Sequence, residues 1–226
     1  MNIKECVDFI NFWIRKERGA FYTIEESVEV IDRGQIAYYN DIMPKYAVSQ
    51  IIKDTLSPFK EKYNFTTTTT ANGVITIPNS AYLDLLDVEI QFTSSGHNVY
   101  YPIKMINEDE RGDRLNSQID PPLITAPVGE IIGIRQIQLY PSVDLYTGTV
   151  SYMRRPIKPY YSYTVVGGRV IDYNPGTSIQ LEWRDTDINA ILLKALASIG
   201  INLSDQEVSQ FAETKSQENY QGVNHL

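Results

Sequence analysis

Hydrophobic residues recur at helical spacing through the first quarter of the chain, which predicts helices there. The first set is Ile3, Cys6, Val7, Ile10, Trp13 and Ile14. Gly19 follows this set and predicts the end of a first helix. Thr23 and Glu26 have the spacing of a capping box, which predicts the start of a second helix that ends at Pro44. A third helix is predicted over residues 46–56.

The middle of the chain has the composition and alternation of strands. Five consecutive threonines at residues 66–70 are β-branched and favour a strand. Asn72 and Gly73 follow, before an apolar–polar alternation at 74–77, and this pattern predicts a β-hairpin. Further strands are predicted at residues 88–92, 99–101, 131–134, 136–140, 147–153, 163–166 and 169–171. Glycines and prolines between these segments are typical of an antiparallel β-domain.

Two further regions complete the chain. Residues 107–130 have little periodicity and several prolines, so a long ordered loop is predicted, of the kind that often forms interfaces. Helical spacing returns over residues 185–199, and Ser204 with Glu207 has the spacing of a second capping box. The last residues, 216–226, are polar and are predicted to be a tail.

These elements predict an α+β fold in which the N- and C-terminal helices form one helical bundle and an antiparallel, β-rich domain is inserted between them. The bundle would comprise residues 1–62 and 181–215. The β-rich domain would comprise residues 63–180, with the long loop at 107–130, and residues 216–226 would be the tail. A chain of 226 residues is long enough to bury a sizeable core.

Composition and charge narrow the function classes. The net charge is −8, from 20 basic and 28 acidic residues, which disfavours a general nucleic-acid binder. The N-terminal residues mix charges into their apolar pattern and no long apolar run occurs, so neither a signal peptide nor a membrane span is expected. The single cysteine, Cys6, excludes an internal disulfide framework and a multi-cysteine zinc site. The 16 tyrosines favour a protein that makes contacts over an enzyme.

Catalytic motifs of the hydrolase, P-loop and zinc-protease types are absent from the sequence. Glu108, Asp109, Glu110 and Asp113 form an acidic cluster, but arginines interleave and the calcium-loop spacing is missing. We therefore expect a solvated or salt-bridged loop there. No catalytic residue, cofactor or metal site is predicted, although a pair of glycosidase carboxylates stays open because their spacing is spatial.

One stretch of the chain is basic. Residues 145–171 contain four basic residues and no acid, whereas residues 182–226 carry seven acids and three bases. The basic stretch is either a solvated strand end or a contact surface for an acidic partner, because arginine and tyrosine are typical interface anchors. That partner could be another copy, since head-to-tail contacts close rings. The candidate interface residues are Arg154, Arg155, Lys158, Tyr160 and Tyr161, with Arg111 and Arg114 from the long loop.

Several short segments, in this order, carry a family resemblance. They are residues 22–26, 73–82, 109–110, 114–117, 121–122, 138–141, 150–156, 181–183 and 199–201. Among them are a Tyr-Pro pair and a Tyr-x-Arg-x-Pro motif. With these segments the chain resembles the head–tail connector proteins of short-tailed bacteriophages, such as tail tubular proteins and the ring proteins of crAss-like phages. The pattern spans most of the chain and transfers no role to any single residue.

The resemblance implies a structural protein of the virion neck that assembles in the host cytoplasm. It implies a dodecameric ring of identical copies that contacts the portal protein and other tail or ring proteins, and no membrane. It also implies a helical bundle with a β-rich insertion. Genomic DNA would pass through the ring without sequence-specific binding, and acidic walls suit this role because they do not hold phosphates. The loop at 107–130 and the tail after Ser216 are candidates for clasping neighbouring copies.

Two alternatives come from other function classes. A β-rich carbohydrate- or receptor-binding module of a phage tail would also use many tyrosines, although the helical ends fit it less well. A hydrolase would use carboxylates, with the acids of residues 108–113 as its candidates. Substituting Arg154 and Arg155 by glutamate should weaken assembly and leave the monomer folded if these arginines form a contact surface.

Overall fold

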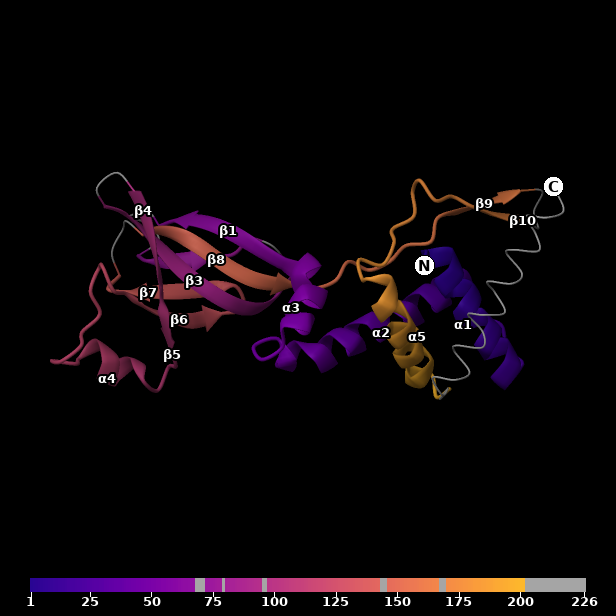
Figure 1. Ribbon diagram of the computed structural model, residues 1–226, viewed down its shortest axis with the longest axis horizontal. Coiled ribbons are helices and arrows are strands. Elements are labelled where there is room, and N and C mark those ends of the chain that lie inside the picture. Colours follow the sequence, from indigo (N-terminus) through magenta and orange to yellow (C-terminus); the bar gives the residue numbers. More distant parts are fainter. Residues whose placement is uncertain (68–71, 79, 95–96, 143–145, 167–169, 202–226) are drawn as a thin grey trace. The chain divides into compact units, whose positions relative to one another are not determined.

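The computed structural model describes residues 1–67, 72–78, 80–94, 97–142, 146–166 and 170–201 (Figure 1). The chain divides into two compact units. The first unit comprises Met1–Pro58 and Pro156–Leu226, and the second comprises Phe59–Arg155. No helix in the described part of the chain is both long enough and apolar enough to cross a membrane.

Local capping sets the helix ends in the first unit. Its helices are α1 (Ile3–Arg18), α2 (Ile24–Ile42), α3 (Gln50–Leu56) and α5 (Asp185–Ser198), with a 3₁₀ turn at Met43–Lys45. The predicted capping box at the start of α2 is confirmed, because Thr23 accepts from the Glu26 N–H and Glu26 accepts from the Thr23 N–H. Gly19 ends α1 with a φ of 60°, as predicted.

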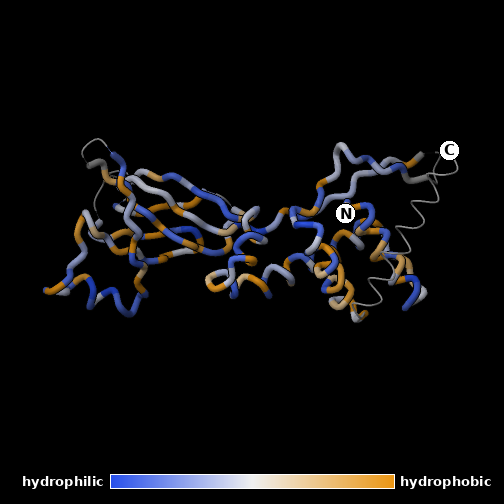
Figure 2. Tube along the Cα trace, viewed as in Figure 1, coloured by the Kyte–Doolittle hydropathy of each residue, from blue (hydrophilic) through white to orange (hydrophobic). Residues whose placement is uncertain are grey.

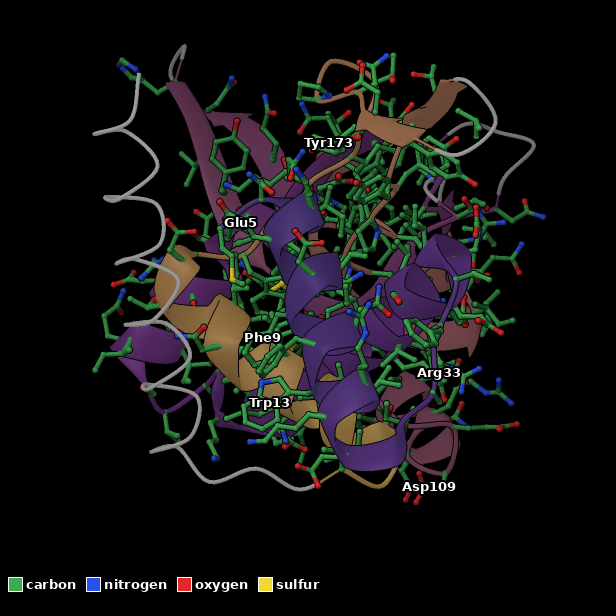
Figure 3. The ribbon with its side chains drawn as sticks, turned by 90° about the vertical axis from the view of Figure 1, so that its right-hand side faces the viewer. Glu5, Phe9, Trp13, Arg33, Asp109 and Tyr173 are labelled. Atoms are coloured by element: carbon green, nitrogen blue, oxygen red, sulfur yellow. The ribbon has the colours of Figure 1, made fainter. Side chains whose placement is uncertain are left out.

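Helix packing in the first unit is centred on α2, which packs against α5 and α1. Glu5, Phe9 and Trp13, four residues apart, line one side of α1 (Figure 3), and the two aromatic side chains are buried. A buried amide joins distant segments: Gln35 donates to Asp32 and to the Ile157 carbonyl, and accepts from the Trp183 indole. Because buried polar groups need partners, this network holds the segments around Ile157 and Trp183 on α2.

The first unit also contains a two-stranded antiparallel sheet. Its strands are β9 (Tyr163–Val166) and β10 (Val170–Tyr173), and Val166 pairs with Val170. The two strands predicted here are therefore confirmed, and the glycines predicted to form their turn lie outside the described residues.

The second unit is built from two four-stranded sheets, one above the other in Figure 1. The first has the order β1 (Lys60–Thr66), β8 (Thr147–Arg154), β3 (Tyr82–Ser94), β4 (His97–Pro102). The second has the order β2 (Val74–Thr76), β7 (Gln136–Tyr140), β6 (Val128–Gly133), β5 (Lys104–Ile106). Side chains of both sheets form one apolar core, for example Phe65, Val150, Ile137 and Leu139.

The chain passes from one sheet to the other between β4 and β5. Ile103 lies at this crossing, and its N–H donates to the Val88 carbonyl over 2.7 Å. β5 then pairs with β6 in parallel, so the second sheet is mixed. A short helix, α4 (Arg111–Leu115), lies between β5 and β6.

The predicted architecture, a terminal helical bundle with one antiparallel β-insertion, is wrong. The described residues contain ten strands in three sheets beside five α-helices, and one of the sheets shares a unit with four of the helices. The second sheet of the second unit is not purely antiparallel. The chain does combine helices with β-sheets, but they are mixed along the sequence. Periodicity predicts an element's type and says little about its partner.

Two local predictions were also wrong. Asn72 and Gly73 have the positive φ angles of the expected turn, 46° and 77°. The strands on either side do not form a hairpin, because β1 pairs with β8 and β2 pairs with β7. The predicted loop at 107–130 contains helix α4 and the first residues of β6. The capping box at Ser204 and the tail at 216–226 lie outside the described residues.

Candidate functional site

The predicted basic stretch is divided between the two units, with Arg155 ending the second unit. The Arg154 Nε lies 3.0 Å from the Glu61 carboxylate, and its guanidinium lies 5.6 Å from the centre of the Phe59 ring. The same carboxylate accepts a hydrogen bond of 2.8 Å from the Tyr152 hydroxyl. Arg154 is therefore part of the sheet of its own unit. The Arg155 side chain is exposed, and its backbone N–H donates to the Ala81 carbonyl.

Lys158 belongs to the first unit and pairs with an acid of α2. Its Nζ lies 2.6 Å from Glu29, and Arg33 approaches the same carboxylate at 3.6 Å. The hydrogen bond from Lys158 lowers the pKa of Glu29. All three side chains are largely exposed, so water screens the pair and its contribution to stability is small.

The two predicted interface tyrosines differ in exposure. Tyr160 is exposed, and its backbone exchanges two hydrogen bonds with Ile179. Tyr161 is buried, and its ring lies 4.9 Å from that of Tyr173 and 6.1 Å from that of Tyr163, measured between centroids. Of the pair, Tyr160 is the side chain that can meet a partner.

Arg111 and Arg114 hold α4 and the segment after it. The Glu130 carboxylate, buried on β6, accepts from Arg111 at 3.3 Å and from the Tyr140 hydroxyl at 3.0 Å. The Glu130 charge raises the pKa of Arg111, and burial together with this hydrogen bond raises the pKa of Tyr140. Arg114 forms an ion pair with Asp120. The two pairs connect the helix to the sheet behind it and to the chain that follows.

A cavity of about 280 Å³ opens between α4 and β5. Its lining residues are Lys104, Ile106, Glu110, Asp113, Arg114 and Ser117. Both signs of charge are present in this lining, so no single ion is favoured. Among the residues that the structure describes, no group of three His, Cys, Asp or Glu side chains is placed to hold a metal ion.

Sequence reasoning missed two groups of exposed aliphatic side chains in the second unit. The first, here called the loop patch, is Ile119, Leu123 and Ile124, exposed by 97%, 55% and 54%. The second, here called the turn patch, is Ile132 and Ile134, two residues apart at the end of β6 and exposed by 46% and 88%; Ile131, the neighbour of Ile132 in the strand, points to the other face. Exposed apolar groups of this kind mark interaction surfaces. The available signal was the presence of large aliphatic residues in segments without strict alternation.

Known proteins do not identify the class of this chain. No protein-family model matches it, and no curated protein matches it.

The ion pairs of Arg154 and Lys158 should contribute differently to the free energy of unfolding. We expect Arg154→Ala to lower the free energy of unfolding by about 1–2 kcal/mol, because it removes a partly buried ion pair and a cation–π contact. Lys158→Ala should cost less than about 0.5 kcal/mol, because its pair is exposed. Urea denaturation of both variants measures the difference, and equal losses would contradict it.

Proposed function

We propose that this chain is a structural virion protein, without enzymatic activity, that forms a ring at the neck of a bacteriophage and connects the portal to the tail. The resemblance of its short segments to head–tail connector proteins supplies this class. The physical support is the exposure of large aliphatic side chains at Ile119 and Ile134, because an assembly protein keeps such surfaces for its partners.

The charges of the chain suit a ring through which DNA passes. The net charge is −8. Candidate cations also have acids of their own unit as partners: Arg154 pairs with Glu61, and Lys158 pairs with Glu29. Cations neutralised in this way release fewer counterions from DNA, so the chain should bind phosphates weakly. Such a surface allows DNA to move past it.

The carbohydrate-binding alternative depends on exposed aromatic rings. Tyr100 and Tyr101 on β4 are each about half exposed, at 49% and 50%. They are neighbours in a strand, and successive side chains of a strand point to opposite faces. The two rings therefore do not line one stacking surface, which favours the assembly function over sugar binding.

Light scattering tests the proposed function. The mass of the purified full chain is measured alone and after mixing with the portal protein of the same phage, with the portal of an unrelated phage as control. We expect binding at a fixed stoichiometry, with a mass that gives the number of copies in the ring. The absence of a complex with its own portal at high concentration would contradict the proposal. Binding of the chain to a glycan array would then support the carbohydrate-binding alternative.

A further inference from the structure

We propose that the loop patch of one copy docks on the turn patch of the next copy, so that the second units join head to tail. This inference rests on the proposed ring and names the surfaces that would close it. Both patches belong to one unit, and each has large aliphatic side chains in contact with water.

The loop patch is held in place by its own segment. The ion pair between Arg111 and the buried Glu130 carboxylate fixes α4 at the start of the segment, and Arg114 pairs with Asp120 inside it. Further along, Leu123 and Ala126 exchange two backbone hydrogen bonds of 3.3 Å and 3.0 Å. Figure 1 shows the segment after α4 extending away from the sheet, and Figure 2 shows hydrophobic positions at its outer end. A fixed loop loses little conformational entropy when it binds.

The turn patch is also fixed. Ile134 lies between β6 and β7. The next residue, Arg135, holds this turn against Ile77 and Pro78, which precede β3. The Arg135 carbonyl accepts from the Ile77 N–H over 2.9 Å, and its guanidinium donates to the Pro78 carbonyl over 3.2 Å. The two isoleucines of this patch, Ile132 at the end of β6 and Ile134 in the turn, are therefore presented on a supported segment.

The two patches lie at opposite ends of β6, and this placement favours a contact between different surfaces. The loop enters β6 at Val128, and Ile134 follows its last residue, Gly133. Six extended residues span about 20 Å. Two separate and different patches are what a head-to-tail contact needs, and a repeated head-to-tail contact produces a ring when the rotation closes.

Charge favours the turn patch over a second loop patch as the partner. Near the start of the loop, Glu108, Asp109 and Asp113 are exposed acids. Residues 131–141 around the turn contain Arg135 and no acid. A loop-to-loop contact would bring like charges together, whereas a loop-to-turn contact pairs opposite charges, and such complementarity sets partner choice.

Cysteine cross-linking tests this contact in the full chain. Ile119→Cys and Ile134→Cys are made singly and together, because both side chains are highly exposed and their replacement should leave the fold intact. The native Cys6 is buried, and burial raises its pKa to about 12, so its thiol should not exchange. Under mild oxidation the double variant should give a ladder of oligomers. The two single variants mixed together should form a mixed dimer roughly tenfold faster than either forms its own dimer.

The control is Val48→Cys in the first unit, which is as exposed as Ile134 and lies in neither patch. Mixed with Ile119→Cys, it should show no preference for the mixed dimer. Faster self-dimerisation of Ile119→Cys, or equal rates for all pairs, would overturn the proposed contact. If the wild-type chain still binds its portal in that case, the proposed function stands and this contact alone is wrong.

Discussion

Alanine at Gly148 is expected to destabilise the second unit by roughly 3 kcal/mol or more. Gly148 lies in the central strand β8, opposite Phe65 of β1 on one side and Ile90 of β3 on the other. A Cβ atom there would lie 2.1 Å from the Glu89 carbonyl oxygen, 2.8 Å from the Phe65 ring and 3.0 Å from the Ile90 Cα. Two of these atoms are backbone, so relief requires β3 to move away from β8 and the sheet to lose its register.

Gly112→Ala is the matched control in the same unit. Gly112 lies in helix α4, and an added Cβ would meet no atom within 4 Å. Alanine is a better helix former than glycine, so this change should be neutral or stabilise by up to about 1 kcal/mol. Thermal and urea unfolding, followed by circular dichroism, compare the two variants. If Gly148→Ala unfolds at the wild-type midpoint, the strands are not packed as closely as described.

Helix boundaries could be predicted because their causes are local. Thr23 and Glu26 are three residues apart, and their reciprocal hydrogen bonds depend on that spacing alone. Gly19 ends α1 because a glycine, without a Cβ, adopts its φ of 60° without strain. The strands β7 and β9 also coincide with the predicted segments, because alternation is a local signal as well.

Strand partners could not be predicted because they are set by distant packing. Asn72 and Gly73 give the turn its backbone angles, but a hairpin also needs the strands before and after the turn to pair in register with each other. Here Phe65 on β1 and Ile75 on β2 reach the shared core from different sheets. The parallel pairing of β5 with β6 was equally hidden, since a helix and a loop separate the two strands.

The candidate site residues also divide into features that the local sequence shows and features that only the fold shows. The sequence shows that Arg154 and Lys158 are cations near aromatic residues and that Arg111 lies among acids. It does not show that their acids are Glu130, Glu61 and Glu29, because the fold brings these partners together. Charge counted along the chain therefore overstates the basic surface available to a partner. Exposure of the two apolar patches was hidden for the same reason, since large aliphatic residues are ordinarily expected inside.

Gly34→Ala should destabilise the first unit, although helix propensity alone predicts the reverse. In an exposed helix this change gains about 1 kcal/mol. Here a Cβ on Gly34 would lie 2.6 Å from the Ile191 carbonyl oxygen and 2.7 Å from the Ala195 Cβ. The backbones of α2 and α5 therefore meet at this point, and any side chain would push them apart. We expect a loss of roughly 3 kcal/mol, measured by urea denaturation of the full chain.

A double-mutant cycle separates this crossing from a general loss of helix stability. Ala195→Gly alone should cost about 1 kcal/mol, because it places a glycine inside α5. Combined with Gly34→Ala it removes the contact with the Ala195 Cβ and leaves those with the Ile191 carbonyl oxygen and the Ala195 Cα, so the double variant should be more stable than the sum of the single losses predicts. Gly176→Ala, whose Cβ would meet only the Asn174 side chain at 3.6 Å, should have little effect in the same unit. Additive losses in the cycle would show that the Ala195 methyl does not meet a Cβ at position 34, and the destabilisation would then have to come from the backbone of α5 or from another cause.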